Sequence, residues 1–219
     1  MTASALTGPA STAPLTVVID WRQPQSYLAL AGIRELATAL GIAIDWQPGC
    51  SRPLSPPSPE SAHEDRGTRH RRHRARYVEH DLRRYAAAQG LALGDLYRSP
   101  DPSLAGIGLL WLKKRADENG EHRAVEDYVD SVFAGYWREA LDIEDVAAVR
   151  DVLESVGAPA AAFDPEALRE EYDLLQLRLR AAGVIEAPAY LVGDDIFIGR
   201  AHVPMIRWLL TGRTGPPPI

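Results

Sequence analysis

The sequence predicts an α/β protein in which both ends of the chain contribute strands to one sheet, with a block of helices inserted between them. Three observations predict this: a βαβ pattern over residues 15–46, a helical stretch from 68 to 183, and a strand pair followed by a helix over 189–210. Because a sheet must bury its faces, the two distant strand-bearing segments are expected to pair with each other.

A βαβ unit is predicted at the start of the ordered chain. Residues 15–19 are a short apolar run rich in β-branched side chains, which predicts a buried strand. Apolar side chains then recur three or four positions apart from 26 to 40 and predict an amphipathic helix that ends at Gly41. The alternation over 42–46 predicts a second strand.

The middle of the chain is predicted to be a loop followed by helices only. Residues 50–66 are dense in proline and serine and indicate an irregular loop. We assign 67–159 to an inserted all-helical domain, and 15–49 together with 160–212 to the sheet domain. Helices are predicted over 68–89, 103–119, 122–140, 143–156 and 164–182, the last beginning at the start signal Asp164–Pro165.

The last elements are a hairpin and a helix. Strands are predicted at 189–192 and 196–198, on either side of turn-forming residues, and a helix at 203–210. Residues 213–219 contain three consecutive prolines and indicate a loose tail. Residues 1–14 are small and polar, and we expect a disordered leader rather than a signal peptide.

Composition narrows the possible partners of this chain of 219 residues. The net charge of −6 gives no general attraction to nucleic acid or to an anionic membrane surface. No run approaches the roughly 20 apolar residues of a membrane-spanning helix. The single cysteine, Cys50, excludes an intrachain disulfide and fits a reducing cytoplasm. We therefore expect a cytoplasmic protein without nucleic-acid or membrane partners.

Three segments carry a resemblance to a known family. They are VVIDWRQPQSYLAL, FAGYWREALDIEDVAAVRDVLESVG and GVIEAPAYLVGDDIFIGR. These resemble the first strand and turn, the helical domain and the cis-proline loop with its hairpin in the DsbA family, in its 2-hydroxychromene-2-carboxylate isomerase and kappa-class glutathione transferase branch. The first segment matches in type at Asp20, Trp21, Pro24, Ser26, Tyr27, Leu28 and Ala29. The resemblance implies a thioredoxin-like (DsbA-type) fold with an inserted all-helical domain, and it hints at a homodimer.

The turn after the first strand lacks the family's redox residues. Redox members place cysteines at both ends of a CxxC turn, where one thiolate attacks and the other resolves. The equivalent residues here run from Gln23 to Ser26, so thiol–disulfide exchange at this turn is excluded. The isomerase branch uses serine at the first position to hold a glutathione thiolate. Gln23 and Ser26 are the candidate catalytic residues here, although Ser26 has an alternative reading as a helix N-cap.

The resemblance also implies a set of cofactor-binding residues, which are Trp21, Pro24, Ala187, Pro188 and Arg200. Pro188 is the candidate cis-proline. Ala187, before it, would pair through its backbone with an extended peptide such as glutathione. An acid that the branch commonly carries after the hairpin is missing, because this chain has Ala201 there. Trp137 is the candidate for lining a substrate pocket.

Other polar features allow more than one interpretation. Arg69, Arg72 and Arg76 would share a helix face, either as a site for a carboxylate or phosphate, or simply as part of a solvated basic helix. The histidines at 63, 70, 73 and 80 have no acid or cysteine at accepted ligand spacing, so no metal site is predicted. Cys50 borders the proline-rich loop, away from the turn, and is interpreted as an incidental thiol.

Two functions remain open. The first is an isomerase- or transferase-like enzyme acting on a small aromatic or unsaturated carbonyl compound, with glutathione or a similar thiol as cofactor. The second is a redox-inactive thioredoxin-like module that binds a peptide or protein along Ala187 and Pro188. A tailoring enzyme whose ligand is unrelated to thiols is a third, weaker alternative.

Overall fold

The computed structural model describes residues 13–61, 65–120 and 122–218. The predicted leader therefore lies largely outside the described residues, as does His63. Residues 49–61 and 213–218 contain no helix or strand.

One mixed sheet joins the two ends of the chain, as the sequence predicts. Its strand order is β2-β1-β3-β4. β1 (Leu15–Ile19) runs parallel to β2 (Ile44–Pro48) and antiparallel to β3 (Ala189–Val192), which forms a hairpin with β4 (Asp195–Ile198). All five residues of β1 are buried, which is typical of a central strand covered on both faces.

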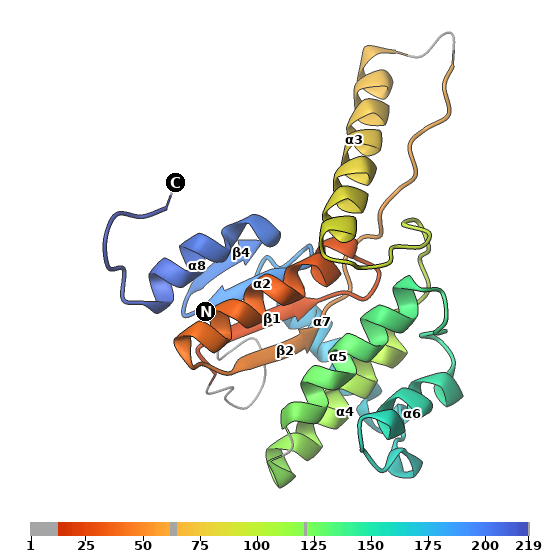
Figure 1. Ribbon diagram of the computed structural model, residues 1–219. Coiled ribbons are helices and arrows are strands. Elements are labelled where there is room, and N and C mark those ends of the chain that lie inside the picture. The colour runs from red at the N-terminus through yellow and green to blue at the C-terminus, as the bar shows by residue number, and fades with distance from the viewer. Residues whose placement is uncertain (1–12, 62–64, 121, 219) are drawn as a thin grey trace.

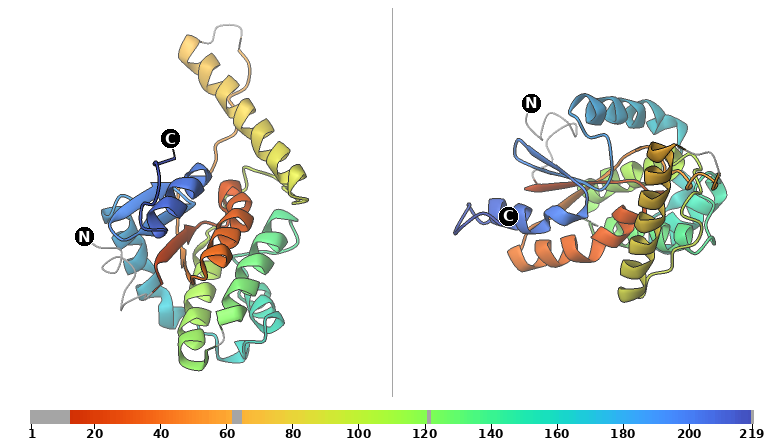
Figure 2. Two further views of the ribbon diagram at one scale, coloured as in Figure 1. Left: turned by 60° about the vertical axis from the view of Figure 1, so that its left-hand side comes forward. Right: turned by 90° about the horizontal axis from the view of Figure 1, so that it is seen from above.

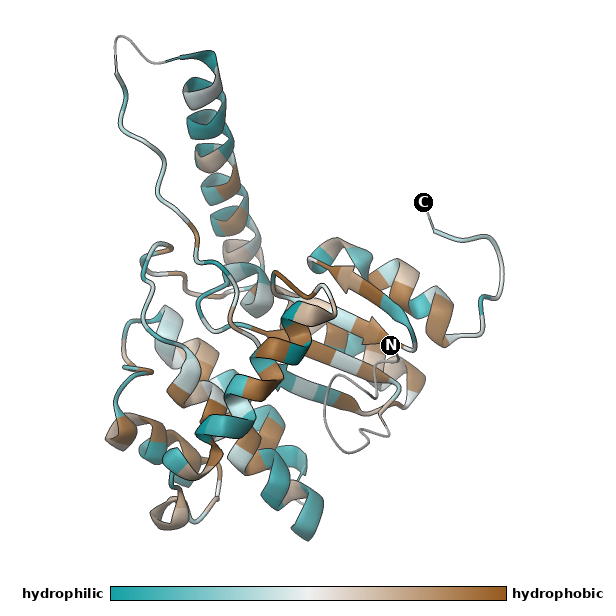
Figure 3. Ribbon diagram, turned by 180° about the vertical axis from the view of Figure 1, so that it is seen from behind, coloured by the Kyte–Doolittle hydropathy of each residue, from teal (hydrophilic) through white to brown (hydrophobic). Residues whose placement is uncertain are grey.

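Helices cover both faces of this sheet. α2 (Pro24–Leu40) and α8 (Val203–Leu210) lie on one face, and α7 (Arg169–Ala181) lies on the other (Figures 1 and 2). Figure 3 shows the apolar residues concentrated along the strands and the polar residues along the helix that stands away from them. No helix among the described residues is both long and apolar enough to cross a membrane.

Besides α7, four helices lie in the described part of the chain between β2 and β3. They are α3 (Arg66–Ala88), α4 (Ser103–Asn119), α5 (His122–Trp137) and α6 (Val146–Ser155). α4, α5 and α6 pack together beside β2, whereas α3 projects from the body of the protein (Figure 1). Short 3₁₀ turns follow as η1 (Ala160–Ala162) and η2 (Glu166–Leu168), and a third, η3 (Arg200–His202), precedes α8.

Local side-chain chemistry explains where several helices begin and end. The Asp65 carboxylate accepts a hydrogen bond from the Thr68 amide at the start of α3. Asp145 caps α6 in the same way. Gly41 and Gly120 end α2 and α4 in the left-handed conformation, which glycine adopts at little cost.

Several predicted boundaries are wrong by a few residues. α2 begins at Pro24 rather than at 26, because the fixed φ of proline suits the first helical position. β2 lies two residues later than predicted, at 44–48. Asp164 and Pro165 begin the 3₁₀ turn η2, where an Asp164 oxygen accepts a hydrogen bond from the Glu166 amide, so α7 begins only at 169.

Candidate functional site

Three chain segments meet at one edge of the sheet. β1 and β2 are parallel, so their C-terminal ends lie together, and the antiparallel β3 begins at the same edge. We call the residues beyond these ends the turn segment (20–26), the loop segment (49–52) and the proline segment (185–188). The candidate site is formed where these three segments meet.

A buried ion pair joins the turn segment to the loop segment. The Asp20 side chain is fully buried and pairs with the Arg22 guanidinium, whose Nε and Nη2 donate to the two carboxylate oxygens at 3.0 and 2.9 Å. The Ser51 amide and hydroxyl donate to the same carboxylate at 2.8 and 2.9 Å. Burial opposes the charge on Arg22, but its hydrogen bonds to Asp20 and the charge of that carboxylate outweigh this and raise the pKa of Arg22.

The two candidate catalytic side chains are engaged within the protein. Gln23 is buried, and its amide donates a 2.7 Å hydrogen bond to the Arg52 carbonyl. Ser26 is fully buried, and its hydroxyl accepts from the Asp20 amide at 3.4 Å. The N-cap reading of Ser26 is wrong, because α2 begins at Pro24 and Gln23 is its N-cap. Gln25 is the one residue of the turn segment that is partly exposed.

This arrangement predicts opposite roles for the two glutamines of the turn segment. Gln23→Ala is expected to lower the free energy of unfolding by roughly 1–3 kcal/mol, because the buried Gln23 side chain loses both its packing and its hydrogen bond to the Arg52 carbonyl. Gln25→Ala, the matched control, is expected to change it by less than about 0.5 kcal/mol. Urea denaturation of both variants measures the difference, and equal stabilities would contradict the assigned contact.

The proline segment presents open backbone groups. The peptide bond between Ala187 and Pro188 is cis, and the Pro188 carbonyl accepts a hydrogen bond from the Gly199 amide at 2.8 Å. Among the described residues, neither the N–H nor the carbonyl of Ala187 takes part in a backbone hydrogen bond. Ile185, two residues earlier, is 66% exposed. An extended peptide can therefore pair with Ala187 as an added strand does.

A shallow hollow connects the proline segment with the loop segment. Its rim includes Gly49, Cys50, Glu186, Ala187 and, from the end of α7, Arg180. The enclosed volume is only about 10 Å³, so a ligand would lie along the rim rather than inside. Arg180 and Glu186 are exposed, and neither forms an ion pair within the described part of the chain. The rim thus offers one free cation, one free anion and an open peptide backbone.

Cys50 lies at this site, which corrects the interpretation that it is remote from the turn. Its Sγ accepts a hydrogen bond from Arg22 Nη2 at 3.5 Å, and the thiol is partly exposed. The same Arg22 nitrogen donates to the Ser51 carbonyl at 2.7 Å. The sequence contained a usable signal, since residues that follow two adjacent parallel strands must lie close together.

The aromatic candidates are in the core. Trp21 is 1% exposed and packs on Phe133 of α5, with ring centroids 4.9 Å apart. Trp137 is equally buried and packs on Tyr136. Pro24 is buried at the first position of α2. These buried side chains support the site from the core of the protein and do not face a ligand.

The comparisons with known proteins agree with this architecture. Residues 15–210 match the family described as the DSBA-like thioredoxin domain. The chain belongs to this family. A search of curated protein sequences finds no match.

Solved structures resemble this DSBA-like thioredoxin domain in fold. A 2-hydroxychromene-2-carboxylate isomerase is 21% identical, with a TM-score of 0.64, over 91% of this chain and 94% of the other. A probable DsbA oxidoreductase from Streptomyces coelicolor is 18% identical, with a TM-score of 0.63, over 94% of this chain and 92% of the other. At these identities the likeness establishes the thioredoxin-like fold.

Arg200 of this DSBA-like domain contacts α3 instead of the unpaired backbone groups of Ala187. Its guanidinium forms a 3.0 Å ion pair with Asp81 and lies over the Tyr85 ring. The predicted basic face of α3 is also partly occupied, because Glu60 lies 3.7 Å from Arg72 and 3.9 Å from Arg76. Among the described residues, no group of three or more His, Cys, Asp and Glu side chains is arranged to hold a metal ion.

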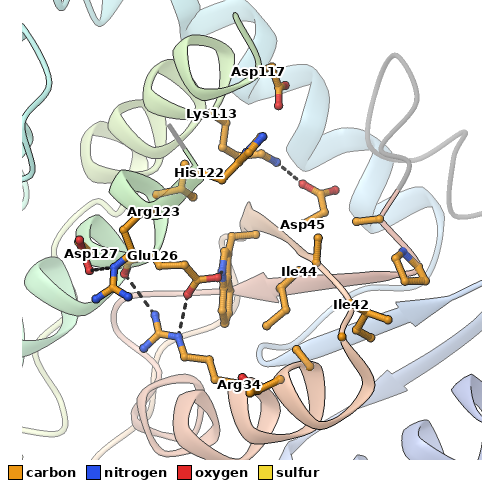
Figure 4. Close-up of a pocket in the computed structure, with 18 of the residues that line it drawn as sticks. Arg34, Ile42, Ile44, Asp45, Lys113, Asp117, His122, Arg123, Glu126 and Asp127 are labelled. Carbon is orange, nitrogen blue, oxygen red and sulfur yellow. Dashed lines mark hydrogen bonds and ion pairs between the residues drawn. The ribbon is translucent and has the colours of Figure 1, made fainter. Parts of the chain in front are cut away.

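A larger cavity, of about 780 Å³, lies at the opposite end of β1 and β2 (Figure 4). Its charged side chains pair across the boundary between the sheet and the inserted helices. Arg34 of α2 pairs with Glu126 of α5 at 2.7 Å, and Lys113 of α4 pairs with Asp45 of β2. The Trp46 indole donates to Glu126 at 2.6 Å. We interpret this cavity as part of the packing boundary between the sheet and the inserted helices, because the cationic side chains Arg34 and Lys113 are already paired with carboxylates.

Proposed function

We propose that this protein binds a thiol peptide of the glutathione class at the proline segment, and that it acts as an isomerase- or transferase-like enzyme on a small unsaturated carbonyl compound. The observation that carries the proposal is the unpaired backbone of Ala187, beside the cis peptide bond and on the same hollow as the exposed charges of Arg180 and Glu186. A glutathione-class peptide has a central peptide backbone with carboxylates and an ammonium group at its ends. The unpaired backbone of Ala187 and the two charges of the rim therefore match the backbone and the charged end groups of such a peptide in chemical type.

Each residue of the rim has a separate binding role in this proposal. The N–H and carbonyl of Ala187 pair with the peptide backbone, as in strand addition. Arg180 attracts a terminal carboxylate, and Glu186 attracts the ammonium group. The start of α2 lacks an acid in its first turn, so its positive end is free to attract negative charge near Gln25. When bound, the thiol peptide supplies a nucleophilic sulfur for reversible addition to the carbonyl compound.

The roles first given to Gln23 and Ser26 need revision within this proposal. Both side chains already bond to the backbone of the protein, so they hold the turn segment and the loop segment in place. Gln25 is the accessible alternative near the start of α2. The double replacement of Gln23 and Ser26 by alanine would then reduce turnover through lost structure, whereas Gln25→Ala would reduce it in a stable protein.

Calorimetric titration with reduced glutathione tests the binding step. The expected result is saturable binding with a dissociation constant near 1 mM or tighter, that is, about −4 kcal/mol. Arg180→Ala is expected to weaken binding by roughly tenfold, because a charge-assisted hydrogen bond is lost. Arg178→Ala is the matched control, since Arg178 is exposed on the same helix but is absent from the rim. Equal loss in both variants would indicate nonspecific charge attraction and would contradict the site.

A second function is favoured by the internal bonds of Gln23 and Ser26. With these side chains engaged, the protein would act as a redox-inactive binding module for an extended peptide or protein segment at Ala187. Exposed Ile185 would then contact an apolar side chain of that segment. Binding of unrelated extended peptides as tightly as glutathione, without turnover of unsaturated carbonyl compounds, would favour this function.

A further inference from the structure

A second cavity lies outside the candidate site, against the helix α3 that projects from the body of the protein. Its volume is about 220 Å³. One wall is a face of α3, and the others are the loop before α3, which runs beside it, and the chain that follows it (Figure 1). The cavity shares no lining residue with the hollow at Ala187.

The interior of this cavity is aliphatic. Leu54 comes from the loop before α3, Val78 and Leu82 from α3 itself, and Leu96 from the chain that follows. Leu82 and Leu96 are buried, whereas Leu54 and Val78 are partly exposed. The floor is therefore protected from water while the upper part is accessible. Covering this apolar surface with the apolar part of a ligand is favourable.

Two exposed arginines, Arg71 and Arg74, also line the cavity. They are three positions apart on α3 and therefore share a face of the helix. Arg74 makes no hydrogen bond or ion pair with any described residue. Arg71 donates one hydrogen bond, from Nη2 to the Thr68 hydroxyl at 2.8 Å, and keeps its other N–H groups available. Guanidinium groups placed in this way can hold a carboxylate by paired hydrogen bonds.

Glu79 is the one acidic residue among those that line the cavity, and its charge is compensated within the protein. One of its oxygens lies 3.3 Å from Arg83 Nε, and the other accepts a hydrogen bond from the Tyr97 hydroxyl at 3.0 Å. Two cations and one compensated carboxylate give the lining a net positive charge. An anionic head group is therefore attracted to this cavity.

The order of these residues along α3 indicates the shape of the ligand. The cations at 71 and 74 come first, and Val78 and Leu82 follow at one and two further turns on the same wall. Residues 74 and 82 are roughly 12 Å apart along the helix axis. An extended chain of about eight carbons spans roughly 10 Å. A volume of about 220 Å³ is below that of pockets for drug-sized ligands, roughly 300–1,000 Å³, and suits such a chain.

We infer that this cavity binds a short aliphatic carboxylate, a fatty acid of about eight carbons. Its carboxylate lies between Arg71 and Arg74, and its chain lies along Val78 and Leu82. The inference goes beyond the proposed function and does not depend on it, because the two sites have no residue in common. Leu54 is two residues from Arg52, whose carbonyl accepts the Gln23 amide, so the ligand also packs on the loop that contacts the turn segment.

Calorimetric titration of the full chain with octanoate tests the inference. Saturable binding is expected with a dissociation constant of about 1 mM or tighter. Binding of 1-octanol, which has the chain without the charge, and of acetate, which has the charge without the chain, is expected to be at least roughly tenfold weaker. 2-Naphthoate tests whether an aromatic carboxylate is preferred.

Three variants test the assigned contacts. Arg74→Gln is expected to weaken octanoate binding by roughly tenfold and to leave 1-octanol binding unchanged. Arg76→Gln is the matched control, because Arg76 is exposed on the same helix but does not line the cavity. Ala75→Leu fills part of the cavity with a side chain that favours helix, and it should weaken octanoate binding in a protein that stays folded by circular dichroism.

Four results would overturn the inference. Equal binding of octanoate and 1-octanol would show an apolar cavity without a carboxylate site. Equal losses in Arg74→Gln and Arg76→Gln would show general charge attraction. Tighter binding of 2-naphthoate than of octanoate would assign an aromatic ligand instead, and unchanged octanoate binding in a folded Ala75→Leu variant would place the ligand elsewhere. None of these results affects the glutathione titration, which tests the rim at Ala187 separately.

Discussion

Asp20→Ala is expected to lower the free energy of unfolding by roughly 3–5 kcal/mol, because it leaves the buried guanidinium of Arg22 without its carboxylate. The carboxylate also accepts the amide and hydroxyl of Ser51, so the loop segment loses its attachment as well. Because small proteins are stable by only about 5–15 kcal/mol, the loss is a large share of the total. Urea denaturation at low temperature measures it.

Two further variants show whether the unpaired buried charge of Arg22 causes the loss of stability in Asp20→Ala. Asp127→Ala removes a carboxylate from an exposed pair with Arg123 and is expected to cost less than about 0.5 kcal/mol. The double variant Asp20→Ala/Arg22→Met removes both charges, and it should be more stable than Asp20→Ala alone. A double variant that is less stable than Asp20→Ala alone would contradict the conclusion that an unpaired buried charge causes the loss of stability.

Trp21→Ala is expected to cost roughly 3–5 kcal/mol, because it opens a cavity between α2 and the inserted helices. Trp21 lies edge-on to Tyr128 at 6.2 Å and against Phe133 at 4.9 Å, both on α5. Trp208→Ala, at a partly exposed tryptophan of α8, should cost clearly less. Thermal unfolding monitored by circular dichroism compares the two.

A third variant separates a core role of Trp21 from the cofactor-binding role that the resemblance implies. Trp21→Phe keeps much of the packing and should bind reduced glutathione as the unmodified protein does. A stable Trp21→Phe variant that binds at least tenfold more weakly, a change of about 1.4 kcal/mol, would show that the indole contacts the ligand.

The fold was predictable because each element has a local signal. Each signal determines structure only in the few residues around it. Examples are the apolar run at 15–19 for β1, the turn residues around Gly193 for the hairpin, and Gly41 for the end of α2. Pairing of the two chain ends followed from the need to bury both faces of a sheet. The boundaries that failed, at β2 and α7, are places where tertiary contacts or a 3₁₀ turn replace the local preference.

The site was less predictable, since its contacts join residues far apart in sequence. The roles of Gln23 and Ser26 came from the position of the turn, and nothing in the sequence shows that Arg52 accepts the Gln23 amide. The proline-rich composition of residues 50–66 masked the structural role of Ser51 and Cys50. Arg180 reaches the rim from the end of α7 and Glu186 from the proline segment, and no periodic pattern indicates that the two lie together.

The measurement that tests the account most directly is the mapping of backbone amide resonances by NMR during titration with reduced glutathione. If glutathione binds along Ala187, the largest shifts are expected in the loop segment and at residues 184–189, with smaller changes near the buried Gln23 and Ser26. Shifts confined to the cavity between Arg34 and Lys113, or an absence of shifts at millimolar glutathione, would contradict peptide binding at Ala187.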